Sequence, residues 1–474
     1  MSSVAKAVET LRLVTSKEPI KGLAQAFADA GFELALVGGP VRDAFLGRPV
    51  HDLDFTTSAT PEQSEKIVKP LAQATWDVGR AFGTIAAQVG PHTVEITTYR
   101  ADTYDGSTRK PDVVFGTSLE EDLHRRDFTM NAMALTLPEA KLVDPCNGLD
   151  DLLAGVLRTP IEPEISFQDD PLRMMRGARF VSQLGVTIHP DTAAAMTTLA
   201  PRIADISAER VREELTRLLA TESPRAGLEV LVESGIADLV LPELPALRLE
   251  SDEHAHHKDV YQHTLTVVEQ AIEEEKRRFP DSPPDVALRV AALLHDIGKP
   301  ATRRFEAGGV VTFYHHDVVG AKLAKKRLKA LRFDNQTIDS VARLIELHLR
   351  FFGYSEQAWT DSAVRRYVRD AGEELERLHI LVRADVTTRN KRKADRLSFA
   401  YDDLEARIAV LAEQEELQAI RPELDGEQIM SILGLKPGRD VGDAYRFLLE
   451  LRLDEGEIGV EEATARLRAW WDNR

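Results

Sequence analysis

The sequence predicts an α+β fold, with a mixed sheet and helices in the N-terminal third and helices alone after it. Segments of strand character, either apolar or alternating in polarity, occur at residues 35–37, 51–56 and 77–98, as expected of buried and half-buried strands. From Ile161 the apolar residues recur at helical spacing between capping and stop signals. We therefore expect a sheet-containing head, a neck, a third part and a tail, with boundaries at 1–155, 156–250, 251–400 and 401–474.

Length and composition limit the class of protein. A chain of 474 residues has room for roughly two to four domains. Its single cysteine, Cys146, excludes an internal disulfide framework and favours a cytoplasmic location. The sequence has no apolar run of membrane-spanning length, so no membrane partner is expected. A net charge of −18 argues against a generally basic nucleic-acid binder, although a local basic groove is still possible because charges are screened beyond about 8–10 Å.

The segment 36–61 is the most informative part of the head. Residues 1–34 before it are expected to be helical and to end at Gly31. The strand at 35–37 is closed by Gly38-Gly39, and glycines there permit a positive φ and a close backbone approach. Their N–H groups could therefore hold phosphate oxygens. A short helix carrying Arg42 is expected next.

Two acids follow in the second predicted strand. Asp52 and Asp54 are two residues apart, so in a strand both side chains point to the same face. They could be solvent-facing acids on an edge strand, or they could bind a divalent cation such as Mg²⁺. Their position directly after the glycines and Arg42 favours the metal site. Glu95 in the third strand-like segment is either a third acid of this site or a surface residue.

These residues belong to a pattern, GG-x-VRD-x-x-LGR-x-x-x-D-x-D, that runs from Gly38 to Asp54. The pattern resembles the signature of the class II CCA-adding tRNA nucleotidyltransferase and bacterial poly(A) polymerase family, a branch of the polymerase-β-like nucleotidyltransferases. The resemblance implies template-independent addition of CMP and AMP from CTP and ATP to the 3′ end of tRNA. It also implies that Asp52 and Asp54 are catalytic and hold Mg²⁺, while Gly38, Gly39 and Arg42 bind the triphosphate.

A second motif lies in Leu119–Ala134, after a stretch at 102–118 that has turn chemistry and is expected to be a flexible loop. Its charged residues could form a solvated helix face. The run RRDFT-x-NA resembles the family motif that holds the ribose and phosphates of the nucleotide. The resemblance assigns this role to Arg125, Arg126, Asp127 and Asn131. A third motif, Asp144–Leu152, resembles the family's DP-x-x-GLDDL and is expected to form a hinge in which Cys146 only packs.

The neck carries a candidate for base selection. Asp170-Pro171 is expected to cap a helix that ends at Gly185, with Arg173 one turn away from Asp170. The acid could simply be a cap that pairs with the arginine. Alternatively, the two could recognise the amine and the ring nitrogen that cytosine and adenine share, and so exclude uracil and guanine. Asp169–Arg173 resembles the family's E-D-x-x-R template, with Asp where Glu is common, and the resemblance adds Arg176 to the nucleotide-binding residues.

The third part contains a set of histidines and aspartates at predicted helix ends. This ordered set resembles an HD-superfamily hydrolase domain that holds one or two divalent metals, such as Mg²⁺, Mn²⁺ or Ni²⁺. The resemblance implies a phosphohydrolase activity, for example the removal of a 2′,3′-cyclic phosphate from RNA ends. The expected metal ligands are His263, His295, Asp296, His316, His348 and Asp385. Three further histidines, His254, His256 and His257, have no assigned role.

Several alternatives stay open at this level. A poly(A) polymerase would use the same site, but Phe82-Gly83-Thr84 resembles the form seen in CCA-adding members and the tail is not strongly basic. An enzyme that adds only CC or only A is a further alternative, against which the loop at 102–118 is a mild argument. A hydrolase with a vestigial head is the alternative from another class. We expect either a monomer or a homodimer, and we expect helices without chemistry at 401–474.

Overall fold

A computed structural model describes residues 3–50, 53–76, 83–100, 116, 118–248, 259–307, 311–351, 354, 359–387, 391–415 and 420–474. The catalytic candidate Asp52, most of the loop predicted at 102–118, Phe82 and the three unassigned histidines lie outside these residues. The chain separates into two compact units, Met1–Leu218 with Ala226–Leu239, and Leu219–Arg225 with Val240–Arg474. We describe each unit by itself.

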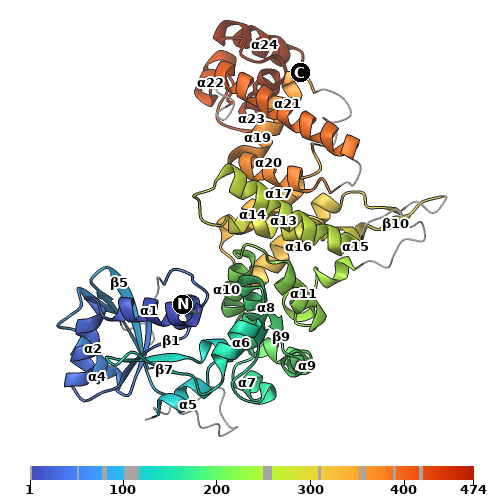
Figure 1. The fold of residues 1–474 in the computed structure, drawn as a ribbon. Helices are drawn as coiled ribbons and strands as arrows, with labels where there is room; N and C mark the ends of the chain where they lie inside the picture. Colours follow the sequence, from blue (N-terminus) through green and yellow to red (C-terminus); the bar gives the residue numbers. More distant parts are fainter. Residues whose placement is uncertain are drawn as a thin grey trace. The chain divides into compact units, whose positions relative to one another are not determined.

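The first unit is built on a mixed sheet (Figure 1). Within the described residues the strand order is β3-β4-β5-β2-β1-β6-β7. β2 and β5 are parallel, and the other neighbours are antiparallel. The strands predicted at 35–37, 51–56 and 77–98 are thereby confirmed where they are described. Their bounds are β1 Leu34–Val37, β2 Leu53–Thr57, β3 Ala74–Trp76, β4 Thr84–Val89, β5 His92–Thr98, β6 Ala134–Leu137 and β7 Lys141–Val143.

The two faces of this sheet have different coverings. One face packs into a core with helices from the start of the chain, and Leu11, Phe27, Leu36 and Phe55 are each no more than 1% exposed there. Because side chains alternate along a strand, Asp54 lies on the opposite face, which a smaller cluster around Leu123 covers. The helices are α1 Ser3–Thr15, α2 Ile20–Asp29, α3 Gly39–Phe45, α4 Pro61–Val68, α5 Leu119–His124 and the 3-10 turn η2 Thr129–Asn131.

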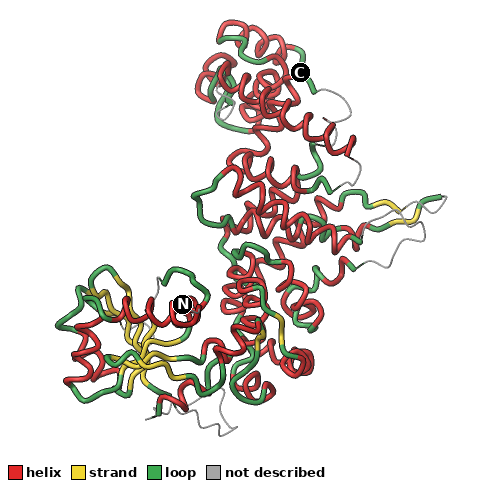
Figure 2. Tube along the Cα trace, in the orientation of Figure 1, coloured by secondary structure: helices red, strands yellow, loops and turns green. Residues whose placement is uncertain are grey.

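The remainder of the first unit is mainly helical (Figure 2). It was expected to be purely helical, but it also contains a short parallel strand pair, β8 Val156–Leu157 and β9 Thr187–Ile188. This pair forms because Thr187 donates its backbone N–H to Gly155 and His189 donates its own to Leu157. The helices are α6 Gly148–Ala154, α7 Pro163–Asp169, α8 Leu172–Leu184, α9 Pro190–Leu199, η3 Ala200–Asp205, α10 Ala208–Leu219, α11 Arg225–Glu233 and α12 Ala237–Val240.

The second unit is helical apart from one hairpin, β10 Arg304–Phe305 with β11 Val311–Thr312, among its described residues. Asp259 and Asp285 cap α13 and α14 through their side chains, as is common for Asp at this position. No helix among the described residues is long and apolar enough to span a membrane. The helices are η4 Pro245–Leu247, α13 Val260–Arg278, α14 Val286–Leu294, α15 Lys299–Thr302, α16 His316–Ala330, α17 Asn335–Leu347, α19 Asp361–Ala371, η5 Gly372–Glu374, α20 Leu375–Ala384, α21 Lys391–Glu415, α22 Gly426–Leu433, α23 Arg439–Glu455 and α24 Val460–Asp472.

Candidate functional sites

The glycine pair joins β1 to α3, with Gly38 as the N-cap residue and Gly39 as the first residue of the helix, and it lies next to two arginines. Gly38 has φ 72° and ψ −128°, a conformation that a residue with a side chain rarely adopts. A β-carbon on Gly38 would also lie 3.3 Å from Nη1 of Arg126. A β-carbon on Gly39 would lie 3.7 Å from Nη2 of Arg42. The sequence thus requires glycine at 38, and it places the backbone of the pair beside positive charge from two separate motifs.

The acids of the head lie on the sheet face that α5 covers. Asp54 of β2 is half-buried and pairs in register with Glu95 of the parallel strand β5. Adjacent residues in register point to the same face, so the two carboxylates are neighbours. Like charges side by side are unfavourable, and a divalent cation bound by carboxylate oxygens would relieve the repulsion. The residues present therefore fit an Mg²⁺ site, and Glu95 lies where a third acid of that site would be.

Asp122 is a residue of this face that the sequence analysis missed. It is 1% exposed, and its Oδ2 accepts hydrogen bonds from Thr56 Oγ1 at 3.2 Å and from Arg126 Nη2 at 3.3 Å. Its Oδ1 pairs with Arg125 Nε at 3.4 Å. Asp122 therefore fixes both arginines of the second motif against β2. The available signal was the spacing of Arg125 and Arg126, three and four residues after Asp122 at the end of a short helix.

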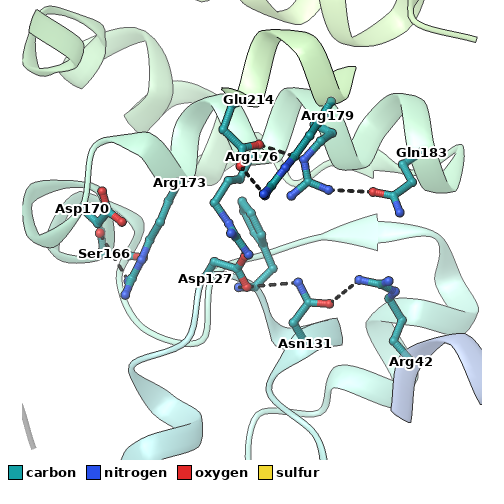
Figure 3. Close-up of polar contacts among 12 residues, drawn as sticks. Arg42, Asp127, Asn131, Ser166, Asp170, Arg173, Arg176, Arg179, Gln183 and Glu214 are labelled. Atoms are coloured by element: carbon teal, nitrogen blue, oxygen red, sulfur yellow. Dashed lines mark hydrogen bonds and ion pairs between the residues drawn. The ribbon is translucent and has the colours of Figure 1, made fainter. Parts of the chain in front are cut away.

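A chain of polar contacts links three predicted nucleotide-binding elements (Figure 3). Arg176 of α8 donates from Nε at 2.8 Å and from Nη2 at 2.6 Å to Oδ2 of Asp127. Asn131 donates from Nδ2 to Oδ1 of Asp127 at 3.0 Å. Its own Oδ1 accepts from Nη1 of Arg42 at 2.7 Å. Four of the predicted residues, far apart in sequence, are thus brought into one network.

The charge state of this network follows from Asp127. Burial of Asp127 raises the pKa of its carboxyl, but the charge of Arg176 and the hydrogen bond from Asn131 outweigh burial and lower that pKa to about 2. Asp127 is therefore ionised at neutral pH. Its Oδ1 also accepts from the backbone N–H of Phe128 at 2.8 Å, so each oxygen already has two donors. The carboxylate thus orients Arg176 and Asn131 in this structure.

Three arginines surround the ring of Phe180 in α8. The distances from the guanidinium carbons to the ring centroid are 4.3 Å for Arg179, 5.4 Å for Arg42 and 5.8 Å for Arg176. The ring is 3% exposed and presents its negative faces to these cations. Buried Glu214 pairs with Arg179 at 2.8 Å. The sequence analysis did not single out Phe180, because an aromatic residue at a helical position gives no sign of its contact with cations.

The base-selection candidates lie at the start of α8, and other groups hold both of them. Asp170 Oδ1 accepts from the backbone N–H of Leu172 at 3.2 Å, and Oδ2 accepts from Nη2 of Arg210 at 3.1 Å. Arg173 donates to Ser166 Oγ at 2.8 Å and to the carbonyl of Arg125 at 2.5 Å. The helix begins at Leu172 with Pro171 as its N-cap residue, one residue later than expected, although Asp170 does satisfy a backbone donor of the first turn.

The predicted metal ligands of the second unit converge from five helix ends. Six side chains form two groups whose ligand atoms lie within 4.8 Å of one another. Asp296 lies between the groups: its Oδ2 is 3.3 Å from Nε2 of His295, and its Oδ1 is 3.3 Å from Nε2 of His316. Lys299 Nζ is 2.6 Å from Oδ2 of the same carboxylate. The first group is His263, His295 and Asp385, and the second is Asp296, His316 and His348.

Three of these histidines point a buried ring nitrogen, Nε2, toward the centre of the candidate metal site. Nδ1 of His295, His316 and His348 lies 2.8, 2.8 and 2.6 Å from the carbonyl oxygen three residues earlier. A carbonyl only accepts, so Nδ1 is the donor in each ring and Nε2 is the nitrogen that a metal would bind. These three Nε2 atoms are buried without a hydrogen-bond partner in the described part of the chain. Buried polar atoms are almost always satisfied, so the residues fit a divalent metal.

The two carboxylates of the candidate metal site, Asp385 and Asp296, are both ionised. Burial of Asp385 raises the pKa of its carboxyl, but the nearby side chains of His263 and His295 outweigh burial and hold that pKa well below its usual range. Asp296 behaves likewise, because His295 and Lys299 outweigh its burial. Two ionised carboxylates are thus buried together beside Lys299 and the histidines, and carboxylate oxygens of this kind are suitable ligands for a divalent cation.

Gly298 permits this convergence. A β-carbon on Gly298 would lie 2.0 Å from the carbonyl oxygen of His316 and 2.7 Å from the backbone nitrogen of Gly320. Only glycine allows the turn after Asp296 to contact α16 at this distance. The contact brings Asp296 and His316 together, although they come from different helices.

Comparisons with known proteins agree with this arrangement. Three family models match the chain: the poly A polymerase head domain at 34–158, the probable RNA and SrmB-binding site of polymerase A at 185–247, and the HD domain at 260–390. An A-adding tRNA nucleotidyltransferase of Deinococcus radiodurans is 36% identical over 450 residues, covering 92% of this chain and 95% of the relative. A CC-adding tRNA nucleotidyltransferase of Thermus thermophilus is 32% identical and covers 92% and 94%.

Further relatives extend the comparison. A CCA-adding enzyme of Leuconostoc mesenteroides is 43% identical over 223 residues, which cover 47% of this chain and 53% of that enzyme. A crystal structure of the Bacillus stearothermophilus CCA-adding enzyme in complex with CTP aligns with a TM-score of 0.68 and 26% identity, covering 97% of this chain and all of that one. The fold class predicted from the sequence is confirmed. The chain is a nucleotidyltransferase that belongs to the family of tRNA nucleotidyltransferases and bacterial poly(A) polymerases, with an HD domain after the neck.

Proposed function

We propose that this chain adds CMP and AMP to the 3′ end of tRNA, using CTP and ATP and releasing pyrophosphate. The observation that carries the proposal is the network of Arg42, Asn131, Asp127 and Arg176, which joins three motifs in one buried site. We infer the RNA substrate from the relatives that match almost the whole chain, which are tRNA nucleotidyltransferases. A cytoplasmic location, where tRNA and both nucleotides are found, is part of the proposal.

In the proposed reaction the 3′-hydroxyl oxygen of the RNA bonds to the α-phosphorus, and the bond from that phosphorus to the pyrophosphate oxygen breaks. Asp52 and Asp54 would hold Mg²⁺, which favours ionisation of the hydroxyl and neutralises the leaving group. The backbone N–H groups of Gly38 and Gly39, with Arg42 and Arg126, would bind the triphosphate. Guanidinium groups pair well with phosphate oxygens.

For the base, we propose that Asp170 and Arg173 form the selecting pair. The exocyclic amine of cytosine or adenine would take the place of Arg210 on Oδ2 of Asp170, an exchange that is feasible because Arg210 is half exposed. Uracil and guanine present a carbonyl at that position and would leave the carboxylate unpaired. Asp127 would act by orienting Arg176, since its oxygens already have donors.

A partial activity is the second candidate, because the relatives that cover the chain almost fully include an A-adding and a CC-adding enzyme. The test uses tRNAs ending before the CCA, after the first C and after the second C, each incubated with one nucleotide at a time. Full CCA addition requires CMP on the first two and AMP on the third. AMP addition to the third alone, CMP addition to the first two alone, or a long A tail would each identify a different enzyme.

We further propose that the HD domain is a metal-dependent phosphohydrolase that removes phosphate from RNA ends, such as a 2′,3′-cyclic phosphate. The carrying observation is the set of buried, unpartnered Nε2 atoms beside Asp296. The metal would supply Lewis-acid activation of water. In the proposed reaction a water oxygen bonds to phosphorus while one ribose oxygen leaves and takes a proton, which opens the cyclic phosphate to a monoester; hydrolysis of the second ribose–phosphate bond by another water then releases phosphate. His295→Ala with Asp296→Ala should abolish hydrolysis in Mg²⁺, Mn²⁺ and Ni²⁺ and leave nucleotide addition within about twofold. The absence of cleavage by the wild type in all three metals would contradict this proposal.

A further inference from the structure

The segment that connects two metal ligands of the HD domain, from Asp296 to His316, and the helix after it carry exposed aromatic and cationic side chains. Phe305 is 70% exposed and Tyr314 is 64% exposed. Two exposed rings lie within ten positions of one another, and each offers a face on which another planar group can stack. The hairpin β10–β11 that holds Phe305 extends away from α15 and α16 (Figure 1).

Cations accompany the rings. The guanidinium carbon of Arg303 lies 4.8 Å from the ring centroid of Phe305, and Arg304 beside it is exposed. Nε of Arg303 is buried without a hydrogen-bond partner among the residues that the structure describes. Aromatic rings and guanidinium planes are the groups on which unpaired bases stack. The hairpin thus has the composition of a base-stacking surface.

The helix α16 continues the positive charge away from the metal site. It carries Lys322, Lys325, Lys326, Arg327 and Lys329 against the single acid Asp317, although the whole chain has a net charge of −18. Exposed positions recur at 318, 322, 325, 326 and 329, which is one face of a helix. Lys325 pairs with Asp339 at 2.9 Å. Within the described part of the chain, Lys322, Lys326 and Lys329 have no acidic partner.

Distance along the helix connects this face to the site. His316 is the first residue of α16 and Lys322 is the sixth residue after it, about 9 Å along the axis at 1.5 Å per residue. Lys329 lies about 10 Å farther. Cations in this arrangement can follow the phosphates of a strand whose end is at the metal ligands.

From these observations we infer that Arg304, Phe305, Tyr314, Lys322, Lys326 and Lys329 form a binding surface for single-stranded RNA that leads its terminal nucleotide to the HD metal site. The inference rests on the proposed phosphohydrolase function and names its substrate as an RNA strand. Bases would stack on Phe305 and Tyr314, and the lysines would contact phosphates. An acidic protein could also bind the lysines, but it would not require exposed aromatic rings such as Phe305, which lies beside Arg303.

The first test compares two substrates of the full-length protein. A ten-nucleotide RNA ending in a 2′,3′-cyclic phosphate requires the surface, whereas a cyclic mononucleotide requires only the metal site. Lys322→Gln, Lys326→Gln and Lys329→Gln together should lower kcat/KM on the oligonucleotide at least tenfold and change hydrolysis of the mononucleotide less than twofold. The slope of log kcat/KM against log salt should also fall by about 2, because three phosphate contacts are lost. Equal losses on both substrates, or no loss on the oligonucleotide, would overturn the inference.

Matched variants separate charge from position. Lys17→Gln, Lys21→Gln and Lys69→Gln together remove the same charge from exposed positions of the head and should leave oligonucleotide cleavage unchanged. Phe305→Leu and Tyr314→Leu keep apolar bulk but remove the ring, and each should weaken oligonucleotide use by about tenfold. Full activity of both leucine variants would exclude stacking.

Binding is tested separately from hydrolysis. RNA containing 4-thiouridine is photo-crosslinked to the wild type, and the crosslinked peptides are identified by mass spectrometry. Crosslinks to Phe305 or Tyr314 without any cleavage would support the surface and reject the phosphohydrolase. Cleavage without such crosslinks would do the reverse. Equal competition by polyglutamate and by RNA of the same charge would indicate a general polyanion surface and overturn the assignment to RNA.

Discussion

Gly298 and the backbone of His316 are so close that a β-carbon on the glycine would lie 2.0 Å from the histidine carbonyl oxygen. Contacts of this length cannot form, so any side chain at 298 must separate the turn after Asp296 from α16. The two ligands lie on opposite sides of this contact. The geometry of the proposed metal site therefore depends on a residue that has no ligand atom of its own.

Gly298→Ala should accordingly reduce metal binding by the HD domain at least tenfold, measured as bound metal per chain after dialysis. Nucleotide addition should persist, because its residues lie in the other unit. Gly442→Ala is the control, since a β-carbon there has nothing within 4 Å and alanine favours helices. Wild-type metal content in Gly298→Ala would show that the turn can move without cost.

The acids of the head give a prediction about rate. Asp54→Asn should lower nucleotide addition by a factor of about a thousand or more while the fold persists, because a metal-stabilised transition state contributes several kcal/mol. We expect the same of Asp52→Asn. Glu95→Gln distinguishes a third metal-site acid from a surface residue: a large loss that excess Mg²⁺ partly restores would identify a ligand. Rapid incorporation by folded Asp54→Asn would refute the metal assignment.

The buried Asp127–Arg176 pair gives a prediction about pH. The folded pKa of Asp127 is about 2, below its usual value, so the unfolded state binds a proton first as the pH falls. The stabilisation is therefore complete above about pH 4 and is lost as the pH falls toward 2. Asp127→Asn lacks this contribution of about 2 kcal/mol. The difference in unfolding free energy between wild type and variant should be largest at pH 7 and should shrink between pH 4 and 2. A difference independent of pH would mean that the pair contributes no charge-dependent stability.

Base selection can be tested at α8. Asp170→Ala with Arg173→Ala should slow the use of CTP and ATP and increase the relative use of UTP and GTP, while triphosphate affinity changes little because its ligands lie near Gly38. Arg210→Ala is the control for this double variant. Because Arg210 only occupies Oδ2 of Asp170, its loss should leave selectivity unchanged. If the double variant discriminates as the wild type does, Asp170 serves only the helix.

The sequence predicted the fold class and named candidate site residues that the structure brings together, and the reason is physical. Gly38 and the six candidate HD ligands can be recognised in the sequence, because backbone conformation or metal chemistry restricts which residue types can occupy these positions. Asp122 and Phe180 gave no such signal, since an acid in a first helical turn and an aromatic on an apolar face are ordinary. Their importance depends on Thr56 and on the three arginines, and only sheet register and helix packing bring these partners together. The pair β8–β9 was missed because two residues are too few to show alternation.

The imidazoles of His295, His316 and His348 each take their orientation from a carbonyl three residues earlier in their own segment. None of these three rings takes its direction from a hydrogen bond to another candidate ligand, so this part of the cage is set before any ion arrives. Because these rings need not move, the reorganisation free energy is small when one ion replaces another. Exchange among Mg²⁺, Mn²⁺ and Ni²⁺ should therefore be rapid and reversible. The identity of the working metal would then follow from the ions that the cell supplies.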